Sequence, residues 1–186
     1  MYKRMMLIGA CVLLVSCGGG SGKSGCVQDF WNGTVGTCLP EDWDVIDTET
    51  LRQRGVPEET IVAFQSTESV SGQFPTVAVT RERLANVTKP HEYSQASMRS
   101  VEIMEQYDHL DTKDFKIDGQ KIQLHIFTAQ PIDGEPKRRF FQVSTTVGDT
   151  GFTVTAVTPV SINSALGKDI QLILENVTFV APEEEE

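Results

Sequence analysis

The sequence predicts an α+β domain, an antiparallel β-sheet flanked by helices. Within residues 115–160, β-branched and aromatic residues alternate with polar ones in three runs, a pattern typical of strands. These runs are residues 122–128, 141–147 and 152–157. Asp118-Gly119 precedes the first run, and this dipeptide favours a two-residue hairpin turn because its residues tolerate positive φ. Two further segments repeat apolar residues at helical spacing, so strands and helices occur in one chain.

The register of the last hairpin can also be predicted. A turn at 148–151, bounded by glycines, leads us to pair Val147 with Phe152. This register places Val143 opposite Ala156, and folding back the preceding strand brings its even-numbered residues onto the same face. A slip by one residue would turn all of these side chains to the other face.

The chain begins with the features of a secretory signal. Lys3 and Arg4 are followed by a short apolar run and by small residues. The run is too short to span a bilayer as a stable helix. We therefore assign residues 1–16 to a signal peptide outside the fold.

The end of this signal is Leu14-Val15-Ser16-Cys17. It resembles the lipobox of bacterial lipoproteins, which implies a diacylglycerol on the Cys17 sulfur and stable anchoring by two or more acyl chains. The alternative is an ordinary cleaved signal followed by an incidental cysteine. Gly18 after the cysteine, by analogy with that family, does not favour retention in the inner membrane, so we expect the outer membrane where one exists.

Removing the signal leaves 170 residues, a size expected for one monomeric domain, which we place at 26–180. A Gly/Ser-rich tether (17–25) precedes it and an acidic tail (181–186) follows. The mature chain has 14 basic and 26 acidic residues, a net charge of −12. This charge disfavours nucleic acid and anionic membrane surfaces as partners.

The cysteines predict one disulfide. Cys11 leaves with the signal and Cys17 carries the lipid, so Cys26 and Cys38 remain to pair in an oxidising envelope. Metal binding by these two cysteines is the alternative, but zinc sites usually need four ligands. We predict no metal site.

A small hairpin is expected between these two cysteines. The Asn-Gly dipeptide at 32–33 predicts its tip. Two-residue pairing about this tip places Cys38 one residue out of line with Cys26, and a bulge at Gly36 would correct the offset. Trp31 is either a core residue or part of an exposed partner-binding patch.

The next segments predict a short helix and two strands. Asp47 or Thr48 can cap a helix that continues through Arg54 and is stopped by glycine. The apolar run 61–64 and the alternating run 75–80 are predicted strands.

Two longer helices complete the prediction. Pro90 suits the first position of a helix whose apolar positions recur as far as Tyr107. The last helix has an apolar stripe through residues 166–177, with Ser161 or Asn163 as its N-cap.

Several features of this layout match a known family. They are Leu39-Pro40-x-x-Trp43, residues 75–80 leading to Pro90, Asp118-Gly119, residues 152–160, the last helix and Thr178-Phe179. Together they resemble the PsbP-like family, named for an extrinsic subunit of photosystem II and sharing its fold with the Ran-binding Mog family. The resemblance implies an antiparallel sheet between helices and a role in binding or assembly. No docking, metal or chloride site carries over.

The residues give little support to catalysis. His91 and His109 are expected at the two ends of the first long helix, and His125 in the middle of a strand, where a packed histidine is simpler than a catalytic one. The sequence has no Gly-x-Ser-x-Gly elbow and no His-Glu-x-x-His motif. Asp111 and Asp114 are expected in turns. We predict no catalytic residue, no cofactor and no enzymatic activity.

The loop 131–139 is the candidate partner-binding surface. Lys137, Arg138 and Arg139 form a basic triplet on an acidic chain, and loops on a rigid sheet often carry binding function. The alternative is that these charges only solubilise a hairpin loop and a sheet edge.

Three functions remain open. The first is a non-enzymatic envelope lipoprotein, held by lipid at Cys17, that faces the extracytoplasmic side and binds or helps to assemble another envelope component. The second is a binder of a small apolar ligand, which requires a cavity beside Phe127, Phe140 or Trp43. The third is an enzyme of unrecognised type, which requires a polar cleft around His125.

Overall fold

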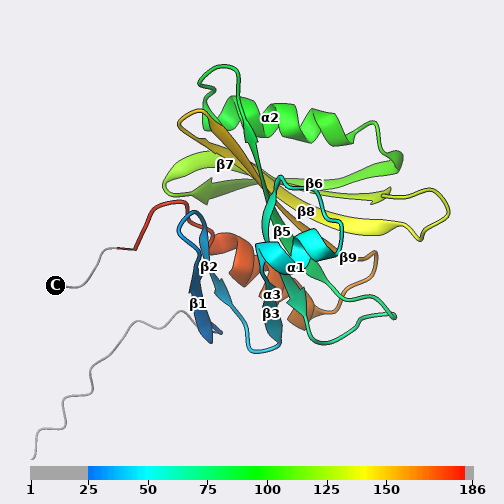
Figure 1. Cartoon of the computed structure of the whole chain (residues 1–186). Helices are drawn as coiled ribbons and strands as arrows, with labels where there is room; N and C mark the ends of the chain where they lie inside the picture. Colours follow the sequence, from blue (N-terminus) through cyan, green and yellow to red (C-terminus); the bar gives the residue numbers. More distant parts are fainter. Residues whose placement is uncertain (1–24, 183–186) are drawn as a thin grey trace, which may run out of the picture.

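A seven-stranded antiparallel sheet with helices on both faces forms the body of the protein (Figure 1). The computed structural model describes residues 25–182. In chain order, the strands are β1 (Gln28–Trp31), β2 (Gly36–Leu39), β3 (Trp43–Ile46), β4 (Thr60–Ser66), β5 (Thr76–Arg83), β6 (Glu105–Ile117), β7 (Gln120–Gln130), β8 (Arg138–Val147) and β9 (Thr150–Pro159). The helices are α1 (Thr48–Gln53), α2 (Pro90–Val101) and α3 (Ser164–Glu175). The α+β prediction is confirmed.

The main sheet has the order β3-β4-β5-β9-β8-β7-β6, and β1 and β2 form a separate two-stranded hairpin. β3 and β6 are therefore the edge strands. β6 carries mainly charged and polar side chains, and its register with β7 shifts between Glu105 and Asp108 and between His109 and Asp111. Charges and bulges of this kind discourage pairing of an edge with another chain.

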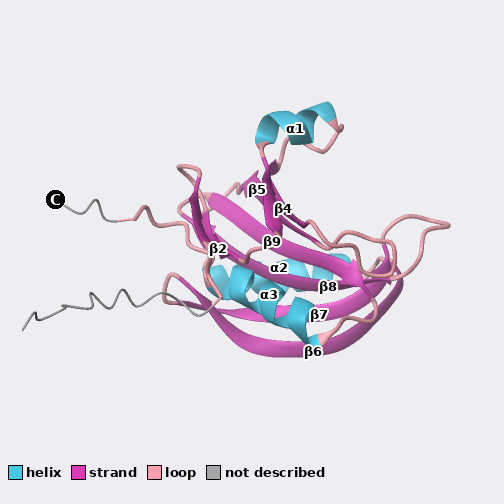
Figure 2. Ribbon diagram, turned by 90° about the horizontal axis from the view of Figure 1, so that it is seen from below, coloured by secondary structure: helices cyan, strands magenta, loops and turns pink. Residues whose placement is uncertain are grey.

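The main core lies on the α3 face of the sheet. Inward residues of β5 and β9, such as Val79 and Val154, are completely buried there against α3 and the β1–β2 hairpin. The stripe of α3 contributes Leu166, Ile170 and Ile173, as the helical spacing predicts. Figure 2 shows α2 and α3 on opposite sides of the sheet.

The opposite face is covered less completely. α2 packs on β7 and β8, while α1 and its cluster of Ile46, Leu51 and Ala63 lie towards the β3–β4 edge. Between the two helices, Thr80 of β5 and Thr155 of β9 are only half-buried. The burial along β5 and β9 therefore alternates between fully and partly buried residues.

The strands predicted within residues 115–160 are present, with one correction to their register. Asp118 (φ 49°) and Gly119 (φ 76°) form the expected turn. Val147, however, pairs with Thr150 and not with Phe152, because Gly148 (φ 62°) allows a two-residue turn. The difference is two residues, so every side chain keeps its predicted face.

The predicted extension of the first long helix is wrong. α2 ends at Val101, and Glu105 already begins strand β6. Met104 and Tyr107 still pack with Val101 against Phe127. The same apolar contacts form without a continuing helix, which explains why the spacing was misleading.

Because β6 begins as early as Glu105, the predictions for three further residues are also wrong. His109 is not at a helix end, because it pairs with Phe127 in the β6–β7 ladder. Asp111 and Asp114 do not lie in turns and are exposed residues of the same strand.

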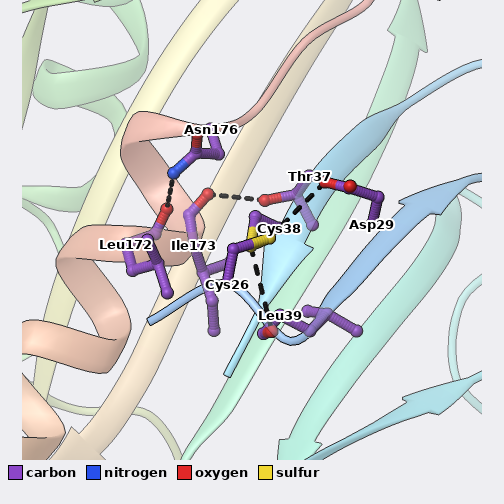
Figure 3. Close-up of a disulfide and its surroundings, with 8 residues drawn as sticks. All are labelled: Cys26, Asp29, Thr37, Cys38, Leu39, Leu172, Ile173 and Asn176. Atoms are coloured by element: carbon purple, nitrogen blue, oxygen red, sulfur yellow. Dashed lines mark hydrogen bonds between the residues drawn. A yellow bond between two sulfur atoms is a disulfide. The ribbon is translucent and has the colours of Figure 1, made fainter. Parts of the chain in front are cut away.

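The N-terminal hairpin differs from the prediction in its turn. Trp31 pairs with Gly36 around a four-residue loop, and Cys38 lies opposite Asp29, so no bulge at Gly36 is needed. Cys26 precedes β1 and reaches Cys38 from outside the ladder. The predicted disulfide is present, with the two Cα atoms 5.6 Å apart (Figure 3).

The other predicted elements are confirmed. The Asp47 carboxylate caps α1 by accepting a hydrogen bond from the Thr50 backbone N–H, and Asn163 caps α3 through the N–H of Leu166. The strands predicted at 61–64 and 75–80 are β4 and β5. Among residues 25–182, none of the helices has the length and apolar content needed to cross a membrane.

Candidate binding site

A groove of about 400 Å³ lies between α3 and strands β6, β7 and β8. Its floor contains three large apolar side chains that remain half-buried: Phe115 of β6, Leu124 of β7 and Phe141 of β8. Gly167 and Leu174 belong to its α3 wall. A volume of this size with a mainly apolar lining is typical of sites for small molecules.

The groove exists because the β1–β2 hairpin holds α3 over the middle of the sheet, away from β6. Phe30 of the β1–β2 hairpin packs edge-on against Phe64 of β4, with ring centroids 5.1 Å apart. The hydroxyl of Thr37 in β2 donates a hydrogen bond to the Ile173 carbonyl of α3 (2.7 Å; Figure 3). The hairpin and α3 thus cover the middle of the sheet together, and the side of α3 towards β6 is left open.

Lysines gather around this groove. Lys113 and Lys168 line it directly, and Lys116 and Lys121 line an adjoining depression of about 590 Å³. These are four of the six lysines among the described residues. Two carboxylates line both hollows, those of Asp114 and Glu175. The local excess of positive charge contrasts with the net charge of −10 of the whole chain.

Gly167 has no local structural reason to be glycine. It lies inside α3, and its φ is not in the left-handed region. A Cβ at this position would meet only the Ile162 Cδ1 atom, at an ordinary distance of 3.8 Å. Glycine in a helix interior costs about 0.5–1 kcal/mol relative to alanine. The absence of a side chain keeps this part of the groove wall open.

On the opposite face, a cleft of about 540 Å³ beside α2 is polar. Two of its hydroxyl groups contact Ser144 beside the cleft: Ser144 Oγ donates to Ser97 Oγ (2.8 Å), and the Ser144 and Thr153 hydroxyls lie 3.0 Å apart. Tyr93 Oη donates to the Glu82 carboxylate (2.7 Å). These contacts attach α2 to the sheet, so we assign them a structural role.

His125 lies in an aromatic column and not in a polar cleft. Its side chain is 1% exposed, and its ring stacks between His109 (5.6 Å) and Phe127 (4.7 Å), measured between centroids. The Tyr107 hydroxyl is 3.0 Å from His125 Nε2. Burial, and secondarily the nearby His109, lowers the pKa of His125, so its neutral form is favoured.

The basic triplet is not one surface. Arg138 faces the α2 side with Phe140, and its guanidinium is 3.7 Å from the Glu135 carboxylate. Arg139 pairs with Thr128 and Thr158 and faces the α3 side. All three residues of the triplet are half-buried. Alternation along β8 therefore divides the charges that are contiguous in the sequence.

The triplet and Trp31 are at opposite ends of the sheet. Trp31 packs over Gly36 and lines a shallow depression with Thr178 and Val180. Thr178 in turn bonds Asp118 in the β6–β7 turn, whereas the triplet follows the β7–β8 loop at the other end. The structure thus does not bring these predicted partner-binding residues together.

The remaining predicted positions have different outcomes. Phe127, Phe140 and Trp43, beside which a cavity was required, are buried in the core. Cys26, Cys38 and Asp29 lie close enough together to suggest metal ligands, but the two sulfurs are bonded to each other. The signal peptide, Cys17 and most of the tether and acidic tail lie outside the described residues.

Sequence reasoning did not find Gly167, Lys113 and Lys168 as site residues. One signal was available, because Gly167 interrupts a helical stripe where no turn is needed. The lysines gave no signal, since Lys113 and Lys168 are far apart in the sequence and only the packing of α3 brings them to one groove.

No protein-family model and no curated protein sequence matches this chain. Solved structures with the same fold do exist. Cyanobacterial PsbP (CyanoP) from Synechocystis sp. PCC 6803 has a TM-score of 0.56 at 14% identity, over 90% of this chain and 99% of that one.

Two further similar structures widen this comparison. LpqN, described as involved in cell envelope biogenesis of Mycobacterium tuberculosis, has a TM-score of 0.57 at 12% identity, over 77% of this chain and 82% of LpqN. A variant of the protein Mog1 has a TM-score of 0.53 at 13% identity, over 82% of this chain and 95% of Mog1. At these identities the similarity establishes a PsbP-like fold and nothing more.

Proposed function

We propose that this chain is a bacterial lipoprotein, anchored at Cys17, whose domain is a non-catalytic module that binds another component of the cell envelope. The observation that carries the proposal is the open groove between α3 and β6–β8, with its apolar floor and lysine rim. Large apolar side chains that remain half-buried in a concave surface are typical of binding sites.

Three further observations support the extracytoplasmic part of the proposal. The lipobox at 14–17 follows a short apolar signal. The disulfide between Cys26 and Cys38 is typical of proteins that mature outside the reducing cytosol. A neighbour with the same fold, LpqN, is described as involved in cell envelope biogenesis.

Anchoring is tested by feeding cells a clickable palmitate analogue. We expect the full chain to be labelled and to fractionate with membranes, and Cys17→Ser to lose both properties. Label that persists in Cys17→Ser would exclude acylation at this residue.

Binding is tested by photo-cross-linking in intact cells. A photoreactive amino acid replaces Lys168, which lines the groove, or Ala165, which is exposed on the same helix and does not line it. We expect a specific adduct with an envelope protein or lipid from position 168 and none from position 165. Equal adducts from both positions, or none, would reject the groove as the binding site.

A further inference from the structure

The geometry points to a ligand class for this groove: we infer that it holds the alkyl chain of a single-chain anionic amphiphile, such as a long-chain fatty acid. This inference rests on the proposed function and names the occupant of the same site. Its three supports are the shape of the groove, the charge at its rim and the glycine in its wall.

The shape fits a linear chain. The α3 residues that line the groove recur at helical spacing, from Ser164 through Lys168 and Gln171 to Glu175, so the groove follows one side of the helix. The eleven residue-to-residue steps from Ser164 to Glu175 correspond to roughly 16 Å at 1.5 Å per step. Opposite this wall, Phe115, Leu124 and Phe141 come from three adjacent strands and form a continuous apolar floor.

The rim fits an anionic head group. Lys113 and Lys168 line the same groove as the apolar floor, and Lys168 is exposed, so its ammonium group is free to meet a carboxylate at the surface. Lys113 has the Asp111 carboxylate at 3.5 Å, but both side chains are more than half exposed and the pair is weak. Asp114 and Glu175 also line the groove, and the two adjoining hollows together hold four lysines against these two carboxylates. This local excess of positive charge favours an anion on a chain whose net charge is −10.

Gly167 is the third support. A side chain at this position would project beside the apolar floor, where the only atom within 4 Å of its Cβ is Ile162 Cδ1. Glycine at position 167 lowers the stability of the helix and leaves a space beside the apolar floor. A narrow alkyl chain can fill this space.

The test uses the full chain in lipid nanodiscs with a diazirine-bearing clickable fatty acid. We expect the label to map to peptides of β6, β7, β8 or α3, to be displaced by laurate, and not to be displaced by methyl laurate, which has the same chain without the charge. Displacement by both would show an apolar site without anion recognition and would overturn the charged part of the inference.

Substitutions locate the site. Gly167→Phe is expected to lower labelling by about tenfold, the loss expected when roughly two methylenes are no longer buried. Ala165→Phe adds the same side chain to an exposed position of the same helix and is expected to leave labelling unchanged. Lys113→Glu and Lys168→Glu should each lower labelling by about fivefold, and Lys137→Glu, outside the groove, should not.

The outcomes separate this inference from the proposed function. If Gly167→Phe leaves labelling unchanged although circular dichroism shows it folded, the alkyl chain does not occupy the groove. If, in addition, the photoreactive residue at 168 captures an envelope protein, the inference fails and the proposed function stands. If the same position captures nothing, both fail. Should Gly167→Phe not fold, Gly167→Leu and the two lysine variants repeat the test.

Discussion

Tyr93 and Gly151 fit together where α2 meets β9. An added Cβ at Gly151 would lie 2.5 Å from Tyr93 Cζ, a distance that real contacts do not reach. Tyr93 is held in place because its hydroxyl donates to Glu82, and burial together with this carboxylate raises its pKa to about 12. The glycine at 151 is therefore required by a neighbouring ring and not by a turn.

Gly151→Ala is expected to lower the free energy of unfolding by about 1–3 kcal/mol, because the tyrosine ring or the strand must move. Chemical denaturation of the variant measures this loss. Gly167→Ala is the matched control with the opposite sign, since its Cβ has room and alanine favours the helix by about 0.5–1 kcal/mol. A loss of stability in Gly167→Ala would contradict the open space at 167, and an unchanged stability in Gly151→Ala would contradict the close contact at 151.

His125 makes the stability of the folded state depend on pH in the acidic range. Its folded pKa is lowered by burial, and secondarily by His109, from the ordinary value of 6.5. Below about pH 6.5 the unfolded chain gains a proton that the folded chain does not take up, so stability falls with pH until the lowered folded pKa is reached. Stability contributed by neutral His125 is thus fully present above pH 6.5.

We expect His125→Phe to flatten the stability profile below about pH 6.5, because phenylalanine preserves the stack on Phe127 without a titrating group. Thermal unfolding at a series of pH values measures this. Comparison with His91→Phe, an exposed position on α2, controls for the loss of a histidine. A profile unchanged in His125→Phe would exclude this residue as the source.

At the scale of elements, the β1–β2 hairpin decides where α3 lies. The hairpin is closed by the disulfide and touches α3 through Thr37 and Ile173. It also reaches the sheet through Phe30 and Phe64. Loosening the hairpin would therefore affect both the loop that the disulfide closes and the α3 wall of the groove.

Removing the disulfide with the double variant Cys26→Ser/Cys38→Ser is expected to lower the free energy of unfolding by about 2–4 kcal/mol, because the unfolded chain is no longer constrained. Denaturation curves measure the change, and a reducing agent added to the unmodified protein should reproduce it. A reductant that opens the bond without shifting the midpoint would contradict the prediction.

The elements themselves were largely predictable, for identifiable reasons. Asp118-Gly119, Asp47 and Asn163 act through local geometry that the sequence carries in full. The extent of α2 was not predictable, because Val101, Met104 and Tyr107 make the same contacts from a helix or from a helix followed by a strand. The register error at Val147 came from turn length, which two glycines left open.

At the scale of the whole molecule, the two helical layers differ in how they are held. α3 buries four large apolar side chains, whereas α2 buries only Tyr93 and Ser94 and is attached through hydroxyl contacts. The candidate site could not be predicted, because it depends on the tertiary position of α3 relative to β6. Periodicity fixes which side of a helix is apolar, but not which strands it leaves uncovered.

Native-state hydrogen exchange should distinguish these layers. We expect amides of α2 to exchange with a lower opening free energy than those of α3 and of β5 and β9, because fewer buried apolar contacts hold α2. Gly151→Ala should increase exchange in α2 more than in α3. Equal protection of the two helices would indicate one cooperative unit across the sheet.

The Asp118 carboxylate accepts hydrogen bonds from Thr178 Oγ1 (2.6 Å) and the Phe179 N–H (2.8 Å), and the Gly36 N–H donates to the Thr178 carbonyl. These contacts fasten the last segment of the domain beside its first hairpin, so both ends of the described chain leave from one pole (Figure 1). A fluorescent protein or affinity handle fused after residue 182 would therefore begin on the side where the described chain starts, at residue 25. The distal pole, with the loop 131–137, stays unobstructed for imaging or capture experiments.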